Sequence, residues 1–330
     1  MNSFPSLLES IADLNKNQID GLLSLASKFK HREGESTQFT YRRPVIATSF
    51  LENSTRTKHS FAVAIQKMGA IYIDFNAETS SLKKGESLEE TFLTLFNQGV
   101  NLCIFRSSVS HQLSQFREFP PIKLINGGDG INEHPTQALL DLFTLQELAA
   151  PQSSDDFSSL AGKTLAIFGD NIHSRVGHSL ISLLPQFGIK IILCGPESFL
   201  PEKSSLPPGV ELSTKRDETL SRCDFIYLLR IQKERHLTEN TLNYFSTNDK
   251  DYHKSYGVNL ELLKKLQKLV PVLHPGPANI GVELDTALIK SSLYKGYHQV
   301  QNSIPMRMAI IQSMLVNNDK NIGKIHGERF

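Results

Sequence analysis

Three hydroxyl residues and an arginine come shortly after an apolar run in the first fifth of the chain. The run Val45–Phe50 predicts a buried strand, and Ser54, Thr55, Arg56 and Thr57 come next, at the start of an expected helix. The N–H groups of a first helical turn point at an anion, and the helix dipole favours negative charge there. Arg56 can add a bidentate clamp. The stretch therefore predicts a phosphate site, although an ordinary helix cap beside a solvated arginine would use the same residue types.

A second polar cluster precedes a helix that we expect to begin near Leu88. Ser80 and Lys84 could reach an anion, because a lysine carries a point charge on a flexible stem. Ser87 and Glu90 have the spacing of a capping box, which predicts the start of that helix. Composition alone favours the plainer alternative, a polar loop ahead of a capped helix.

His134 and Gln137 lie one turn apart at the start of a third expected helix. Glycines 127, 128 and 130 permit a tight turn just before it, and Pro135 suits the first turn of a helix. Such a pair could bind a carbonyl oxygen and an amide nitrogen, which is what a carbamoyl group requires. A single histidine here could instead be a helix cap or a satisfied core residue.

Basic and turn-forming residues also follow apolar runs in the second half of the chain. Arg175 lies shortly after one such run. Arg230 and Gln232 share one side of an extended segment, so they can converge on one ligand, although a solvated charged loop would look the same. Pro275 and Gly276 belong to a rigid turn with few backbone donors, which leaves carbonyl groups to accept from a ligand N–H₂.

The composition is that of a globular protein with an ample core: 330 residues, 39% hydrophobic and 21% charged. The net charge of +1 gives no reason to expect nucleic acid or a membrane surface as partner. Three separated cysteines without a C-x-x-C pair indicate free thiols in a reducing compartment. No run reaches membrane-spanning length and no signal-peptide core is visible, so we expect a cytoplasmic protein. The missing G-x-G-x-x-G motif argues against a nicotinamide or flavin cofactor.

Apolar runs alternate with helical patterns, which predicts two α/β domains, each with a parallel sheet covered on both faces. The expected strands are 45–50, 70–75, 101–106, 122–126, 164–169, 190–195, 224–229 and 270–274. Helices are expected at 55–68, 88–98, 135–149 and 304–316, and a polar connection at 151–159 separates the two series. Several polar residues fall at or just beyond the carboxyl ends of strands, where open α/β sheets bind ligands. They are Ser54 to Thr57, Arg106, His134, Arg230 and His274.

Together these motifs resemble those of the aspartate/ornithine carbamoyltransferase family, and within it the aspartate carbamoyltransferase catalytic chains. The Ser-Thr-Arg-Thr and His-Pro-Thr-Gln pieces mark carbamoyltransferases in general, whereas the Arg-Ile-Gln-Lys-Glu-Arg segment from Arg230 points to aspartate. The His-Cys-Leu-Pro segment and Ser-Met-Gly loop of ornithine enzymes are absent. The resemblance extends from about residue 5 to 317. Its carriers are Phe50, Ser54 to Thr57, Ser80, Lys84 to Glu86, Arg106, Gly128 to Gly130, His134 to Gln137, Arg175, Arg230 to Gln232 and His274 to Pro277.

The resemblance implies two doubly wound parallel-sheet domains with the active site in the cleft between them. Residues 1–147, completed by a C-terminal helix at 300–330, would bind carbamoyl phosphate, and residues 148–299 would bind L-aspartate. The implied reaction transfers the carbamoyl group of carbamoyl phosphate to the amino group of L-aspartate. Its products are N-carbamoyl-L-aspartate and phosphate, in de novo pyrimidine (UMP) biosynthesis. It needs no metal and no organic cofactor.

The same resemblance assigns the candidate residues to three overlapping sets. The implied catalytic residues are Arg56, Thr57, Lys84, Arg106 and His134. The implied contacts of carbamoyl phosphate are Ser54, Thr55, Arg56, Thr57, Ser80, Lys84, Arg106, His134, Gln137, Pro275 and Gly276. The implied contacts of the aspartate carboxylates are Lys84, Arg175, Arg230 and Gln232.

The resemblance also implies a homotrimer with shared active sites, because Ser80 and Lys84 of such chains enter a neighbouring subunit's site. A larger assembly with regulatory chains or a dihydroorotase is compatible with it. The stretch from Lys233 to Gly257 is expected to close over bound substrates. The chain departs from the family pattern at Lys58 and Ile280, where relatives commonly carry arginine.

Two alternatives stay open on the sequence. One is a carbamoyltransferase for another amine, although Arg175 and Arg230 would repel a cationic acceptor such as ornithine. The other is a catalytically silent homologue that serves as a scaffold or regulatory partner, for which Ile280 is the one reason. An assay for carbamoyl aspartate, with competing acceptors, separates these readings.

Overall fold

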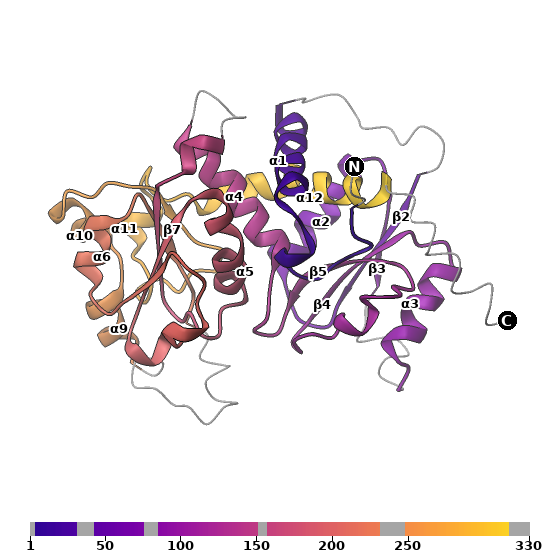
Figure 1. Ribbon diagram of the computed structural model, residues 1–330, viewed down its shortest axis with the longest axis horizontal. Coiled ribbons are helices and arrows are strands. Elements are labelled where there is room, and N and C mark those ends of the chain that lie inside the picture. Colours follow the sequence, from indigo (N-terminus) through magenta and orange to yellow (C-terminus); the bar gives the residue numbers. More distant parts are fainter. Residues whose placement is uncertain (1–3, 32–42, 76–84, 151–156, 232–247, 317–330) are drawn as a thin grey trace. The chain divides into compact units, whose positions relative to one another are not determined.

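The structure, a computed structural model, describes residues 4–31, 43–75, 85–150, 157–231 and 248–316. By its internal contacts the chain divides into two units (Figure 1). The first comprises Met1–Phe143 and Val300–Phe330, and the second comprises Thr144–Gln299. Within the described ranges, none of the helices combines the length and the apolar character that crossing a membrane requires.

The sheet of the first unit has five strands, all paired in parallel, in the order β1-β5-β4-β2-β3. The strands are β1 (Leu7–Leu8), β2 (Val45–Phe50), β3 (Ile71–Phe75), β4 (Leu102–Ser107) and β5 (Lys123–Asp129). Strands β4 and β5 are buried along their whole length. Such burial explains their continuous apolar character, because a strand covered on both faces has no solvent side to alternate with.

Helices cover both faces of this sheet because the chain changes direction across it. Helix α2 (Thr55–Lys67) connects β2 to its neighbour β3, and α3 (Leu88–Asn97) leads from β3 back past β2 to β4. Since crossovers between parallel strands are right-handed, opposite directions place the two helices on opposite faces, as Figure 1 shows. Phe92 of α3 packs edge-on against Phe105 and Phe116, with ring centroids 5.6 and 5.4 Å apart.

Three further helices contribute to the first unit: α1 (Lys16–His31), α4 (Pro135–Ala149) and α12 (Gly296–Val316). The boundary between the units falls inside α4 and again inside α12. The later part of α12 belongs to the first unit and is bonded into it. Arg307 donates to the hydroxyl of Ser60, and the ammonium of Lys123 donates to the carbonyl of Met314.

The second unit repeats the architecture, with the strand order β10-β9-β6-β7-β8 and parallel pairing throughout. Its strands are β6 (Thr164–Phe168), β7 (Lys190–Cys194), β8 (Val210–Ser213), β9 (Phe225–Leu228) and β10 (Val272–Leu273). Its helices are α5 (Arg175–Leu183), α6 (Arg216–Arg222), α9 (Asp249–Tyr256), α10 (Leu260–Lys265) and α11 (Thr286–Ile289). Leu220 and Leu263 pack from α6 and α10 onto the apolar side chains of the sheet.

The predicted fold class, two α/β domains with parallel sheets, is confirmed. Sequence patterning missed β1 and β8, which are short and have no run of branched apolar residues. The expected strand at 270–274 is only the pair Val272–Leu273. The expected connection at 151–159 lies mostly outside the described residues, and its end belongs to a 3₁₀ helix, Phe157–Leu160.

The stretch Lys233–Gly257, which is expected to close over substrates, ends in regular structure. Residues 232–247 lie outside the described residues, but Asp249–Tyr256 is a helix, α9. Its Tyr252 is buried in a cluster with Phe199, Ile231 and Val282. A helix anchored by a buried tyrosine belongs to the core of its unit.

Candidate active site

The amino terminus of α2 carries the hydroxyl and arginine motif. Ser54 is the residue that precedes the helix, with extended backbone angles, but its side chain makes no capping hydrogen bond to the described residues. Ser87 at the start of α3 does form the predicted capping box with Glu90. The N–H groups at the start of α2 therefore lack the side-chain cap that those of α3 have. This difference disfavours the ordinary-cap interpretation and leaves the α2 terminus suited to an anion.

Thr57 and His134 come together although 77 residues separate them in the chain. The threonine hydroxyl lies 3.3 Å from Nε2 of the histidine, and both side chains are buried. Nδ1 of His134 lies 3.5 Å from the hydroxyl of Thr136. His134 precedes α4, which starts at Pro135 as predicted. The phosphate motif and the carbamoyl motif thus share one edge of the first sheet.

Arg106 is brought to the same edge by strand pairing. Arg106 lies opposite Phe50 in the pairing of β4 with β2, and Phe50 precedes the amino terminus of α2 by only a few residues. The side chain of Arg106 is 9% exposed. One terminal nitrogen donates to the carbonyl of Gly127 at 3.1 Å, and the other lies 3.2 Å from the carboxylate of Glu52. A guanidinium held on two sides presents a fixed direction of positive charge.

Gln137 is oriented by a buried carboxylate one turn further along α4. Its amide nitrogen donates to Asp141 at 2.9 Å, and Asp141 is fully buried. The negative charge of Asp141 acts on Arg307, which is buried with its guanidinium 4.7 Å from the ring centre of Phe61. Burial lowers the pKa of Arg307 to about 9, and the charge of Asp141 opposes that shift. Gln137 is therefore linked through Asp141 to a buried cation of α12.

In the second unit, Arg175 is the first residue of α5 and is buried. Ser174 caps the helix by accepting from the N–H of Gly177 at 3.1 Å. The loop between β6 and α5 starts at Gly169, which has a φ of +126°, and a Cβ there would lie 2.8 Å from the carbonyl oxygen of Leu229. Only glycine therefore lets this loop approach the segment that carries Arg230.

Arg230 follows β9 and the turn with Pro275 and Gly276 follows β10, its paired neighbour. Arg230, Pro275 and Gly276 are all half-buried. The N–H of Gly276 donates to Nδ1 of His274 at 2.8 Å, so the histidine holds the turn. Arg175, Arg230 and this turn come from loops at the carboxyl ends of three adjacent strands, β6, β9 and β10.

Three predicted site residues lie outside the described residues: Ser80, Lys84 and Gln232. Their placement stays a prediction. Thr55 and Arg56 are exposed at the α2 terminus.

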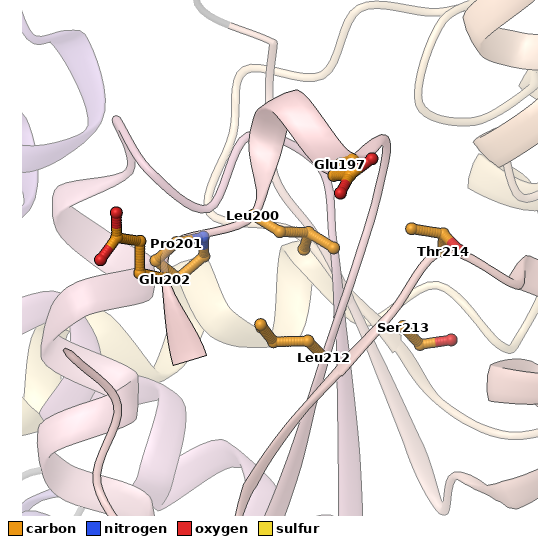
Figure 2. A pocket seen from close by; sticks show the side chains of 7 residues that line it. All are labelled: Glu197, Leu200, Pro201, Glu202, Leu212, Ser213 and Thr214. Carbon is orange, nitrogen blue, oxygen red and sulfur yellow. The ribbon is translucent and has the colours of Figure 1, made fainter. Parts of the chain in front are cut away.

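A surface pocket of about 520 Å³ lies elsewhere in the second unit, beyond the carboxyl ends of β7 and β8 (Figure 2). Its lining residues are Glu197, Leu200, Pro201, Glu202, Leu212, Ser213 and Thr214. They include none of the predicted site residues of the described chain. Two carboxylates would repel an anionic substrate, so this pocket does not fit the chemistry that the motifs predict.

Glu9, His111 and Asp129 form one cluster with potential metal-ligand atoms within 4.8 Å of one another. The carboxylates already have partners, because Asp129 accepts from the N–H of His111 at 2.8 Å and Glu9 pairs with Arg117 at 2.7 Å. Such internal bonding indicates a structural cluster that ties β1 to β5.

Sequence reasoning missed several residues that orient the predicted ones, notably Glu52, Asp141 and Glu283. Glu52 lies between β2 and Ser54, and its position beside a phosphate motif gave a weak signal. Asp141 is one turn after Gln137, a spacing at which helical side chains meet. Glu283 lies in a loop, and no local pattern marks it.

Comparisons with known proteins agree with this geometry. Residues 7–147 match the family model "Aspartate/ornithine carbamoyltransferase, carbamoyl-P binding domain", and residues 161–314 match "Aspartate/ornithine carbamoyltransferase, Asp/Orn binding domain". An aspartate carbamoyltransferase catalytic subunit of Prochlorococcus marinus is 38% identical over 93% of this chain and 96% of its own.

Solved structures of aspartate transcarbamoylase from Trypanosoma cruzi are similar as well. The complex with carbamoyl phosphate has a TM-score of 0.80 at 27% identity, over 94% of this chain and 96% of that one. The complex with N-(phosphonacetyl)-L-aspartic acid has a TM-score of 0.77 at 27% identity, over 94% and 95%. The chain belongs to the aspartate/ornithine carbamoyltransferase family.

Proposed function

We propose that this chain is an aspartate carbamoyltransferase, which transfers the carbamoyl group of carbamoyl phosphate to the amino group of L-aspartate. The products are N-carbamoyl-L-aspartate and phosphate. The observation that carries the proposal is the approach of Thr57 to His134 beside an uncapped helix terminus, with Arg106 on the neighbouring strand of the same sheet. Relatives of the same name support it.

The first unit would hold carbamoyl phosphate. Ser54, Thr55 and Arg56 would bind the phosphate together with N–H groups of α2, where the helix dipole favours an anion. Thr57 and His134 would then contact the carbonyl oxygen beside it. When the amine attacks the carbonyl carbon, that oxygen gains negative charge. Donors already fixed at its position stabilise the transition state without having to reorganise.

Arg106 would bridge the phosphate and the same carbonyl oxygen. Its contacts with Glu52 and Gly127 fix the guanidinium plane before the substrate arrives. Gln137 would hold the carbamoyl N–H₂ through its amide oxygen, since its amide nitrogen already donates to Asp141. The carbonyl groups of Pro275 and Gly276 would accept from the same N–H₂.

Aspartate would bind to the cations of the second unit. A dicarboxylate needs at least two positive partners, and Arg175 and Arg230 lie in loops after neighbouring strands of one sheet. Gln232 and Lys84 complete the proposed set. The domain assignment, with residues 1–147 and 300–330 for carbamoyl phosphate and 148–299 for aspartate, belongs to the same proposal.

The deciding experiment supplies purified protein with carbamoyl phosphate and measures carbamoyl aspartate by its colour reaction. Aspartate, ornithine and putrescine are offered singly and in competition. Of the three acceptors, we expect only aspartate to be turned over, because two guanidinium groups attract a diacid and repel an amine cation. Turnover with ornithine or putrescine would reassign the acceptor. Absence of turnover in protein that binds both substrates by calorimetry would favour the silent homologue.

We further propose a homotrimer in which Ser80 and Lys84 of one subunit complete the site of the next, alone or with regulatory chains or a dihydroorotase. Subunits with Lys84→Ala and Arg56→Ala, each inactive, should regain activity when mixed, because some interfaces then join two intact halves. Mixed trimers that form and stay inactive would contradict shared sites. A cytoplasmic place in pyrimidine (UMP) biosynthesis is part of the proposal, and three buried free thiols support it.

A further inference from the structure

Glu283 is a buried carboxylate that joins two loops at the carboxyl edge of the second sheet. Its side chain is 2% exposed. Oε1 accepts from the N–H of Ile231 at 3.1 Å and from the side-chain amide of Asn279 at 3.1 Å. Oε2 accepts from the N–H of Asn279 at 2.7 Å. One side chain therefore holds backbone groups that are 48 positions apart, at 231 and 279.

Both loops carry residues of the proposed site. The first follows β9 and presents Arg230, whose neighbour Ile231 supplies the bonded N–H. The second follows β10 and contains Pro275 and Gly276, four and three residues before Asn279. The carboxylate of Glu283 thus sets the position of the acceptor-binding loop relative to the loop proposed to hold the carbamoyl N–H₂.

The same backbone is fixed from its other side by apolar packing. Ile231 is fully buried, in a cluster with Phe199, Tyr252 and Val282. In an extended segment neighbouring side chains point in opposite directions, so the inward anchor at 231 directs Arg230 away from that cluster. Packing fixes the depth of the segment, and the hydrogen bond to Glu283 fixes the rotation of its peptide plane.

The N–H donors around Glu283 favour its ionised form, while burial favours the protonated form. Three N–H donors converge on two oxygen atoms, so neither oxygen can carry a proton without facing a donor. A glutamine at position 283 would offer only one acceptor oxygen, and its N–H₂ group would face one of the three N–H donors. Burial nevertheless raises the pKa of Glu283 to about 7, while the backbone donors lower it. Among the described residues, the titratable side chains of α9 beside this loop include Tyr252, Tyr256 and His253, the last through a 3.0 Å contact with the carbonyl of Val282.

We propose that Glu283 is a positioning residue for aspartate recognition, which holds Arg230 in binding register by tying its neighbour Ile231 to Asn279 of the next loop. This inference rests on the proposed function, which assigns Arg230 to the binding of aspartate. It predicts that the residue influences the acceptor far more than carbamoyl phosphate, whose proposed phosphate contacts lie in the first unit.

The test compares Glu283→Gln with a matched control, Asp224→Asn. Asp224 also accepts a backbone N–H, from Thr164 at 2.8 Å, but at the opposite end of the same sheet. We expect Glu283→Gln to raise the KM for aspartate about tenfold or more, since misplacement by about 1 Å can cost about 10² in rate. The dissociation constant of carbamoyl phosphate, measured by calorimetry without aspartate, should stay within about twofold of the wild-type value. That change is smaller than the loss of one typical hydrogen bond would cause. Asp224→Asn should change neither value.

Two further readouts separate positioning from a general loss of structure. The wild-type KM for aspartate should rise as the pH falls through about 7, where Glu283 takes up its proton, and the Glu283→Gln enzyme should lack that component. Amide hydrogen exchange should quicken at Ile231 and Asn279 in Glu283→Gln but not at the start of α5. Exchange tests the positioning even if the wild type makes no carbamoyl aspartate, an outcome that would refute the proposed function separately.

Unchanged exchange at both amides in folded Glu283→Gln would overturn the inference. So would a fall in carbamoyl phosphate affinity that parallels the loss of aspartate affinity. If Glu283→Gln does not fold, Glu283→Asp keeps the charge and shortens the reach, and the same aspartate-selective KM effect is expected from it. An aspartate KM equal to that of wild type in Glu283→Asp would then count against the proposal.

Discussion

Replacing Thr57 by valine removes a single hydroxyl and keeps the shape of the side chain. The hydroxyl lies 3.3 Å from Nε2 of His134, and the two side chains are 5% and 4% exposed. In such a dry site, loss of one donor to the developing oxyanion costs about 10²–10³ in kcat, or about 2.7–4 kcal/mol. We expect Thr57→Val to show a loss of that size, with the KM for aspartate nearly unchanged, because the acceptor contacts lie in the second unit.

Thr91→Val is the matched control for this change. Thr91 is also a buried threonine in the first turn of a helix, and its hydroxyl donates to the carbonyl of Ser87 at 3.1 Å. Each substitution removes one buried hydrogen bond, so each should lower the free energy of unfolding by about 1–3 kcal/mol. Urea unfolding and initial rates of carbamoyl aspartate formation, measured on both variants, separate the catalytic cost from the structural one.

The two variants should therefore have similar stability and very different turnover. A folded Thr57→Val enzyme that loses less than about tenfold in kcat would refute the oxyanion role, given the usual size of such losses. If Thr91→Val lost as much kcat as Thr57→Val, the loss would come from destabilised helices and not from a missing donor to the oxyanion.

Three other outcomes are expected. Arg175→Gln should raise the KM for aspartate by about 10- to 100-fold, as expected for a lost charge-assisted hydrogen bond of about 1.5–3 kcal/mol, and leave calorimetric binding of carbamoyl phosphate unchanged. Because the pKa of Glu283 is raised from 4.5 to about 7 in the folded state, the free energy of unfolding should fall as the pH rises from 4.5 to 7. The fall should be about 3 kcal/mol and absent from Glu283→Gln titrations. Arg307→Met should lower the free energy of unfolding by about 3–5 kcal/mol, since it leaves the buried charge of Asp141 without its cation, and a loss below about 1 kcal/mol in urea would contradict that.

Local signals were enough to locate most elements of the fold. The strand Val45–Phe50 and the helix Pro135–Ala149 have the predicted bounds. Continuous apolar runs indicate strands buried on both faces, and Pro135 fits a helix start only at the first turn. The Ser87 capping box was likewise readable, because its two partners lie three residues apart. The strands β1 and β8 were missed since their pairing depends on distant neighbours and not on their own residues.

The motifs, through their resemblance to those of carbamoyltransferases, also predicted the chemistry, whereas each motif by itself left a plain structural alternative open. What the sequence left undecided is which of those residues meet. The 3.3 Å approach of Thr57 to His134 depends on parallel pairing that brings the carboxyl ends of strands to one edge. The supporting carboxylate of Glu283 depends on a loop contact across 52 positions. Such contacts carry no local pattern, because burial and long-range hydrogen bonding arise only once the sheet has formed.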